Sequence, residues 1–580
     1  MRPTPINSAI ESKFVSTPSF DYYPKPESCG ATPSSCFFCI MAEHDPSLRR
    51  ARIARFFKGS GLLHDARDLV LVLIALWHVA MAHPDDDEFP SLGIFDFLKG
   101  LMERAARDGS WLLRDRNVYI PYYAAHVIGS YTMNRPEFAK EAVLSGVVPP
   151  LVELMRGTMS WVEQRAAVRA LGHLASYEET FGAVAVYEEE IIPLALRVMT
   201  TCVDNVYASF VGLKGEKRPD YHRDLLTRGL IGTELEDRRA EEWASQLQCW
   251  SIYLLSCFAT KGRGLHLIWD EQGLQRELCE TWGGIMYRNS PAGIGLLRIL
   301  CRTQVGREKI SDCRQVIDAL CNLARSAGDW QYMAIDCLLL LLNDRDTRKK
   351  VEETITPCLL DLVDLKTLGK RSRLGEQISR ALNLYHPMRF IERDDEFMSC
   401  EQSDERKIGM LAKLLKEKGN MLFRDGNIKG AISKYSEALD VCPRNLRKER
   451  MVIHSNRSQC YLHLQEPDKA ISDTTRALSL SSPTNSHGKS LWRRSQAYDM
   501  KGLAKESLMD CVMYVRWWFK SERNNNKGVN GRMMKIIPYY ASSMIRKQKE
   551  ATWLFRRSEL KTMAGNMVGD DERNLASDPI

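Results

Sequence analysis

A helical pattern that recurs after about 42 residues limits the possible folds of this chain more than any other feature. The segment AGIGLLRILCRTQVGREKI (292–310) aligns with QYMAIDCLLLLLNDRDTRKKV (331–351), so that Leu297 falls over Leu339. Apolar residues recur at helical spacing through residues 50–380, without the alternation that is typical of strands. Because a helical unit of this size cannot bury its apolar face alone, successive units must stack into one continuous core. The sequence therefore predicts an all-α fold, an α-solenoid.

The sharpest copy of the unit lies earlier in the chain. A glycine precedes VVPPLVELM (147–155), and a short polar turn separates this helix from WVEQRAAVRALGHLA (161–175). This arrangement resembles the second and third helices of an armadillo repeat, although HEAT repeats have similar lengths. The sequence therefore predicts an armadillo-like superhelix over residues 49–385, after an irregular leader at residues 1–48. The segment GLKGEKRPDYHRD (212–224) fits no repeat and is predicted to be an exposed insertion.

A second period begins after the armadillo-like array. Small and aromatic residues recur there at offsets of 0, 12, 16, 19 and 24 positions, at Gly419, Ala431, Tyr435, Ala438 and Pro443. Two antiparallel helices need small residues where their backbones approach closely, and the pattern resembles the tetratricopeptide (TPR) family. The sequence predicts a three-repeat TPR domain at 409–520. The other predicted segments are a linker (386–408), a basic loop with a capping helix (521–556) and a flexible tail (557–580).

Five polar residues recur on the first helices of these TPR units. Lys416 and Asn420 are four residues apart and share one helix face. Asn456 follows 36 residues after Asn420, and Lys489 and Arg493 repeat the four-residue spacing. We expect these three cations and two amides to converge on the concave face of the repeats. Because cations give charge-assisted hydrogen bonds and amides can donate, the set suits a carboxylate ligand.

These residues carry a resemblance to a known family of domains. KEKGN, SNRS and KSLWR match the pattern KxxxN…N…KxxxR, and residues 411–515 resemble the carboxylate-clamp TPR domains of co-chaperones. Such domains bind the C-terminal Glu-Glu-Val-Asp of cytosolic heat-shock chaperones. The resemblance implies that Lys416 and Lys489 bond carboxylates, whereas Asn420 and Asn456 hold the C-terminal Asp. It implies that Arg493 bonds an upstream side chain or backbone group. The longer turns and the weak third repeat depart from the family pattern.

The predicted function is that of a co-chaperone or chaperone-linked adaptor. The predicted partners are the C-terminal tails of cytosolic heat-shock chaperones and an unidentified client or partner protein in the armadillo groove. The alternative is an armadillo/TPR scaffold in nuclear transport or nucleic-acid-linked complexes, without chaperone binding. Residues 405–520 hold 22 Lys and Arg against 12 Asp and Glu, a charge that would suit either nucleic acid or an acidic ligand. Two observations disfavour this alternative and a nucleic-acid partner: the basic, aromatic-bearing loop at 516–535 is short, and the regular Trp/Asn ladder of importin-type grooves is absent.

Catalytic and metal-binding motifs give no competing prediction. The sequence has no P-loop, HExxH or nucleophile elbow and no GxGxxG after a strand, so neither an enzyme nor a cofactor is predicted. The one cysteine cluster consists of Cys29, Cys36 and Cys39, with His44 five residues beyond. Its spacing and the lack of a second CxxC favour reduced cysteines, and no metal site is predicted. Whether these four residues bind zinc is left open by the sequence.

The sequence also predicts where the protein resides. The N-terminus lacks the apolar region of a signal peptide. The longest apolar run, LVLVLIALWHVAMA (69–82), is shorter than a bilayer span and contains His78. Sixteen cysteines are spread through apolar stretches, as is typical of buried thiols in a reducing compartment. We therefore expect a cytoplasmic protein without a membrane partner, with the nucleus as a second location.

Overall fold

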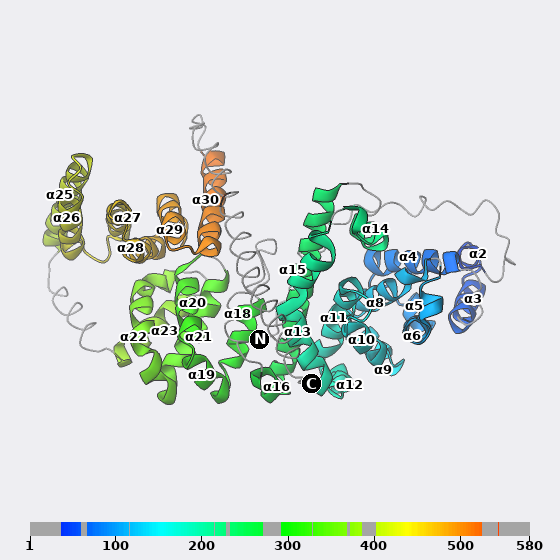
Figure 1. The fold of residues 1–580 in the computed structure, drawn as a ribbon. Coiled ribbons are helices and arrows are strands. Elements are labelled where there is room, and N and C mark those ends of the chain that lie inside the picture. The colour runs from blue at the N-terminus through cyan, green and yellow to red at the C-terminus, as the bar shows by residue number, and fades with distance from the viewer. Residues whose placement is uncertain are drawn as a thin grey trace, which may run out of the picture. The chain divides into compact units, whose positions relative to one another are not determined.

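The structure is a computed structural model. It describes residues 36–59, 66–114, 116–213, 215–227, 232–270, 292–327, 329–367, 372–385, 402–524 and 543. Within these ranges all regular structure is helical, which confirms the predicted all-α solenoid (Figure 1). Most of the predicted leader and linker, the predicted capping helix and the predicted tail lie outside the described residues.

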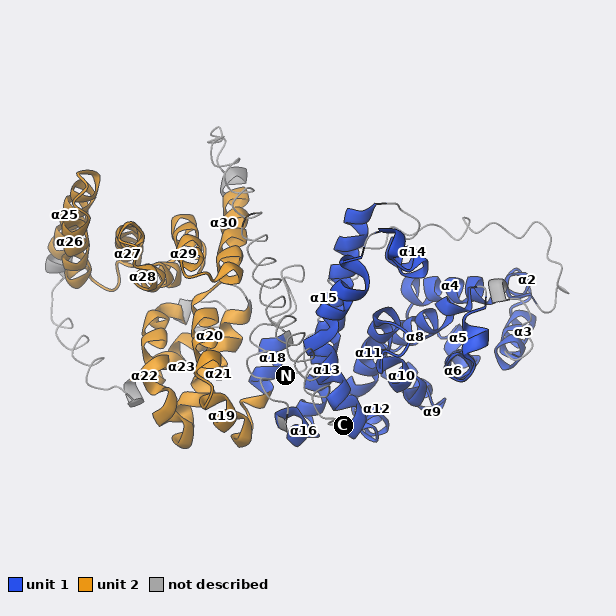
Figure 2. Ribbon diagram, viewed as in Figure 1, with its two compact units in different colours: residues 1–299 blue, residues 300–580 orange. Residues whose placement is uncertain are grey.

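The chain divides into two compact units, residues 1–299 and residues 300–580 (Figure 2). The long helices of the first unit are α3 (Pro46–Lys58), α4 (Ala66–Ala82), α6 (Ile94–Arg107), α8 (Ile120–Tyr131), α9 (Pro136–Leu144), α10 (Val148–Met155), α11 (Trp161–Ser176), α12 (Glu178–Ala185), α13 (Glu188–Val206), α14 (Asp220–Thr227), α15 (Thr233–Thr260) and α18 (Ala292–Leu300). Shorter elements are α2 (Phe37–Met41), α5 (Glu88–Ser91), α7 (Gly109–Leu112), η3 (Asn117–Tyr119), η4 (Tyr207–Val211), η5 (Gly215–Lys217) and α16 (Leu265–Asp270).

Successive helices of the first unit stack as repeats do. Helix α4 packs on α8, α8 on α11, and α11 on α15. Small residues allow the close approach: a Cβ on Gly172 of α11 would lie 3.1 Å from Cδ1 of Tyr253 on α15. Leu73 of α4, Leu171 of α11 and Leu255 of α15 are fully buried. The stack therefore forms the continuous core that the repeat pattern requires.

The apolar run at 69–82 falls within α4 and supplies part of this core, including Leu73 and Leu76. Among the described residues, no helix combines the length and the apolar character needed to cross a membrane.

The predicted exposed insertion at 212–224 is exposed at several positions, including Glu216 and Asp220, but the prediction is wrong for Arg218 and His222. Arg218 and His222 are only 6% and 4% exposed. The Arg218 guanidinium donates to Glu236 Oε2 at 2.9 Å and to Asp237 Oδ1 at 2.6 Å, both on α15. The imidazole of His222 lies 3.0 Å from Ser160 Oγ. These polar contacts bury two side chains of a segment that has no apolar periodicity of its own.

The second unit contains two groups of helices. The first group is α19 (Gln304–Ser311), α20 (Arg314–Arg325), α21 (Asp329–Asn343), α22 (Arg345–Asp361), η6 (Val363–Thr367) and α23 (Ser372–Tyr385). The second group is α25 (Gln402–Arg424), α26 (Ile428–Val441), α27 (Arg447–His463), α28 (Pro467–Leu480), α29 (Gly488–Met500) and α30 (Ala504–Asn524). The second group forms three consecutive pairs, α25 with α26, α27 with α28, and α29 with α30 (Figure 1).

Gly419 and Tyr435 explain how the first of these pairs closes. A Cβ on Gly419 would lie 2.7 Å from Cε1 of Tyr435, so only glycine lets α25 approach α26 this closely. Tyr435 is 2% exposed and shares a core cluster with Ala431 and Ala438. The residues that define the repeat in the sequence are thus those at which the two helices touch.

Candidate peptide-binding site

Helix α25 carries Lys416 and Asn420 on the side that turns toward α27. Lys416 Nζ forms an ion pair with Glu449 Oε2 of α27 at 3.2 Å, and its side chain is 16% exposed. A second carboxylate, that of Glu417, lies 3.7 Å from the same nitrogen. Gly419 lies three residues after Lys416 on α25 and packs against Tyr435, so the packing of the helix pair also fixes the direction of Lys416.

Two asparagines of the site meet in one hydrogen-bonded chain. Asn420 Oδ1 accepts from Asn456 Nδ2 at 3.1 Å and from the Tyr435 hydroxyl at 2.7 Å. Asn420 Nδ2 donates to Glu417 Oε2 at 3.1 Å. Burial raises the pKa of Tyr435 to about 12, so its hydroxyl keeps its proton and remains a donor at neutral pH. The buried tyrosine therefore fixes the orientation of both amides.

Arg493 of α29 is held against α27. Its Nε donates to Gln459 Oε1 at 2.9 Å, and its Nη1 donates to the Ser455 carbonyl at 2.6 Å and to Ser455 Oγ at 2.8 Å. Ser490 Oγ of α29 also donates to Ser455 Oγ at 3.0 Å. Burial lowers the pKa of Arg493, which still leaves the guanidinium charged at neutral pH. The cation is thus positioned before any ligand arrives.

Lys489 lies one turn before Arg493 on α29 and is exposed. His487 lies just before this helix, and its Nδ1 is 2.8 Å from Ser490 Oγ. Burial, followed by the charges of Arg493 and Lys489, lowers the pKa of His487 to about 4. The imidazole is therefore neutral at pH 7, and the two basic side chains set the charge at this end of the site.

The structure places the five predicted residues on three helices, α25, α27 and α29. Asn420 and Asn456 are in direct contact, with Lys416 one turn before Asn420 on α25. Arg493 is hydrogen-bonded to α27, and its charge acts on the Tyr435 hydroxyl that binds Asn420. Lys489 lies one turn before Arg493 on α29. Lys416 was expected to bond a ligand carboxylate, but in the structure it already forms an ion pair with Glu449.

Sequence reasoning did not identify Glu449 and Gln459 as parts of the site. Both share a face of α27 with Asn456, because 449, 456 and 459 are spaced seven and three residues apart. That spacing was a usable signal. The spacing does not show which partners Glu449 and Gln459 bind, because this depends on how α25 and α29 pack against α27.

A second polar network lies between α27 and α28 and supports the site. Arg457 Nε donates to Asp473 Oδ2 at 2.7 Å, and His454 Nδ1 lies 2.9 Å from Asp473 Oδ1. Burial opposes ionisation of Asp473, but hydrogen bonds from Arg457 and His454 outweigh it and lower the pKa of this carboxyl to about 2. Asp473 is thus an ionised buried anchor for α27, the central helix of the site.

The cysteine cluster adds no metal site to this description. Cys29 lies outside the described residues, and within the described part of the chain no group of three or more His, Cys, Asp or Glu side chains could hold a metal ion. The structure therefore does not test whether Cys29, Cys36, Cys39 and His44 bind zinc.

Comparison with known proteins agrees with a repeat architecture. A family model described as "Plant ARM repeat" matches residues 28–270. "Protein unc-45 homolog B" of Danio rerio is 38% identical over 88 residues, which are 15% of this chain and 9% of the relative. "Tetratricopeptide repeat protein 12" of Homo sapiens is 41% identical over 73 residues, which are 13% of this chain and 10% of the relative. The chain thus matches only about a tenth of the length of these relatives.

Among solved structures, the chain is similar to "First TPR of Spaghetti (RPAP3) bound to HSP90 peptide SRMEEVD". The identity is 27%, and the match covers 25% of this chain and 94% of that one, with a TM-score of 0.19. The family match, the curated relatives and the helix pairs together identify an armadillo- and TPR-like repeat protein.

Proposed function

We propose that this chain is a chaperone-linked adaptor whose TPR region binds the free C-terminus of an acidic peptide, that of the heat-shock chaperones ending in Glu-Glu-Val-Asp. The observation that carries the proposal is the direct contact of Asn420 with Asn456, together with Lys416 one turn before Asn420 on α25 and Arg493 held on α27. Amides between cations can hold a carboxylate by several hydrogen bonds at once, which single surface lysines cannot do.

The three cations would play different parts in binding. Lys489 is exposed and can reach a ligand carboxylate directly. Arg493 uses Nε and Nη1 on α27, so its contribution is a fixed positive charge close to the amides. Lys416 binds Glu449, and a ligand carboxylate must share or replace that partner. The site would therefore select for acidic peptides that can compete with an internal glutamate.

The rest of the proposal concerns the whole protein. The armadillo-like array would bind a client or partner protein that remains to be identified, and the protein would act in the cytoplasm, with the nucleus as an alternative. One relative named above is a tetratricopeptide repeat protein, which supports a binding role. A nucleic-acid-linked scaffold is the competing function, although its support is the basic charge of residues 405–520 alone.

A titration of the full-length protein tests the clamp. The probe is a fluorescent ten-residue peptide that ends in a free Glu-Glu-Val-Asp. Lys489→Ala should weaken binding by about 10-fold or more, because it removes a charge-assisted hydrogen bond. Lys469→Ala is the matched control: this lysine of α28 is 62% exposed and pairs with Glu466. Equal affinities of the Lys489 variant, the control and the unaltered protein would contradict the proposal.

A parallel titration with single-stranded RNA separates the competing function. Contacts with phosphates weaken steeply as the salt concentration rises. Tight, salt-sensitive RNA binding without peptide binding would favour the nucleic-acid-linked scaffold.

A further inference from the structure

The C-terminal end of α20 is completed by side chains of the TPR region. The last four carbonyls of a helix have no partner within that helix. In α20 the Asn322 carbonyl accepts from the Tyr498 hydroxyl at 3.2 Å. The Arg325 carbonyl accepts from Arg494 Nη1 and from Thr475 Oγ1. Helices α28 and α29 thus supply the cap that the last turn of an armadillo-like helix requires.

The cap on Arg325 comes from a fully buried ion pair. Arg494 and Asp510 are both 0% exposed, with Nε to Oδ2 at 2.7 Å and Nη2 to Oδ1 at 2.8 Å. These two bonds leave Nη1 for the Arg325 carbonyl. A cation at a helix C-terminus is favoured by the partial negative charge of the unpaired carbonyls. Arg494 directly follows Arg493 of the proposed clamp, so the same helix serves both contacts.

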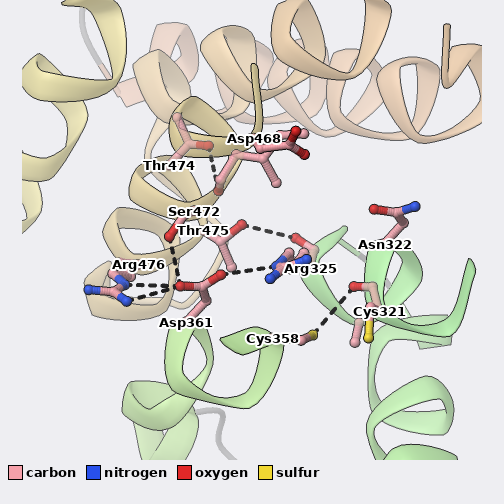
Figure 3. A network of polar contacts seen from close by, with 12 residues as sticks. Cys321, Asn322, Arg325, Cys358, Asp361, Asp468, Ser472, Thr474, Thr475 and Arg476 are labelled. Atoms are coloured by element: carbon pink, nitrogen blue, oxygen red, sulfur yellow. Dashed lines mark hydrogen bonds and ion pairs between the residues drawn. The ribbon is translucent and has the colours of Figure 1, made fainter. Parts of the chain in front are cut away.

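A second set of contacts surrounds Asp361 at the end of α22, as Figure 3 shows. This carboxylate is 4% exposed and accepts from Arg325 Nε at 3.0 Å. From α28 it accepts the Ser472 hydroxyl at 2.7 Å and the Arg476 guanidinium at 3.1 Å. One buried carboxylate therefore joins a cation of each helix group, and losing it would leave both cations without this partner.

Apolar packing continues across the same boundary. Ala327, which follows α20, is 2% exposed and lies in one core cluster with Leu478, Leu491, Cys511 and Tyr514 of the TPR region. Leu491 belongs to α29, between Lys489 and Arg493. The core beneath the proposed clamp therefore includes a residue from the armadillo side.

We infer that α20, α22 and the TPR helices α28 and α29 form one cooperative unit, in which Arg494 and Asp361 are positioning residues for the clamp. A ligand bound at the clamp then stabilises α20 and α22 as well. This second part rests on the proposed function, whereas the first part does not. The TPR region is accordingly no independent module, and binding at the clamp is linked to the end of the armadillo-like array.

Hydrogen exchange of the full-length protein tests the cooperative unit. Asp361→Asn should raise the exchange rates of the slowest amides of α20, α22, α28 and α29 together, by about 100-fold. Asp468→Asn is the matched control, because Asp468 of α28 is 78% exposed and pairs with Lys501. The control should leave those rates unchanged. Faster exchange confined to α20 and α22, with α28 and α29 unchanged, would overturn the inference.

A milder variant covers the case in which Asp361→Asn unfolds the unit. Tyr498→Phe removes only the hydroxyl that binds the Asn322 carbonyl. It should raise exchange in α20 and α29 by about 5-fold, as expected for one lost hydrogen bond. An effect on α29 alone would contradict a shared unit.

The linkage is tested by adding the acidic peptide to the unaltered protein. At a free concentration of 100 times its Kd, the peptide should slow exchange in α20, α22 and α29 by about 100-fold. Protection of α29 without α20 and α22 would overturn the inference while leaving the proposed function intact. Failure of the peptide to bind would refute the proposed function, and the Asp361 and Tyr498 variants would then decide the cooperative unit by themselves.

Discussion

Gly419→Ala should destabilise the first TPR helix pair and disturb the two amides of the proposed clamp, Asn420 and Asn456. The new Cβ would lie 2.7 Å from the Tyr435 ring, and this ring is 2% exposed, so it cannot swing into solvent. Forcing a methyl group into such a contact costs about 1–3 kcal/mol. Displacing the ring also strains the hydrogen bond from Tyr435 to Asn420, worth about 1 kcal/mol. Alanine regains about 1 kcal/mol of helix propensity over glycine. The net expectation is a loss of about 1–3 kcal/mol.

The assay is the free energy of local opening of α25 and α26, measured by hydrogen exchange on the full-length protein. Gly182→Ala in α12 is the matched control, because nothing lies within 4 Å of its added Cβ. The control should stabilise its own helix by about 0.5–1 kcal/mol. If Gly419→Ala leaves α25 and α26 as stable as before, or more stable, the close-approach reasoning is wrong.

Two further predictions concern buried and internal carboxylates. Because the pKa of Asp473 is lowered to about 2, its ionised form stabilises the folded state above pH 4 and this contribution is lost as the pH falls from about 4 toward 2. Asp473→Asn should remove that acid-dependent loss and lower the free energy of unfolding at pH 7 by about 3–5 kcal/mol. Thermal unfolding at pH 7 and over the range from about pH 4 toward pH 2 would measure both effects. A variant that keeps the acid dependence would contradict this prediction. Glu449→Gln should tighten peptide binding by about 3- to 10-fold, because it removes the internal competitor for Lys416, and weaker binding in the titration would show that Glu449 supports the site instead.

The repeat architecture could be predicted because it depends on local periodicity. Leu297 and Leu339, aligned in the sequence, are both core residues, 0% and 5% exposed. Gly419 and Tyr435 likewise meet where their repeat pattern requires close approach. Such positions are fixed by the spacing of side chains along a single helix or helix pair, and this spacing is present in the sequence itself.

The polar pairings could not be predicted in the same way. The contact of Arg494 with the Arg325 carbonyl joins residues 169 positions apart, and it depends on how two repeat arrays with different periods meet. The pairing of Lys416 with Glu449 depends on the packing of α25 against α27. The burial of Arg218 depends on carboxylates supplied by α15. In each case the deciding partner comes from another element, and no local pattern marks it.

The most direct test of the account is a calorimetric titration of the full-length protein with two peptides. Both have the same ten residues ending in Glu-Glu-Val-Asp, but one carries a free C-terminal carboxylate and the other an amide. The account predicts binding of the free acid with a Kd of about micromolar order and its loss on amidation, because the amides and cations around Asn420 hold the terminal carboxylate. Equal binding of both peptides, or no binding of the free acid, would contradict it.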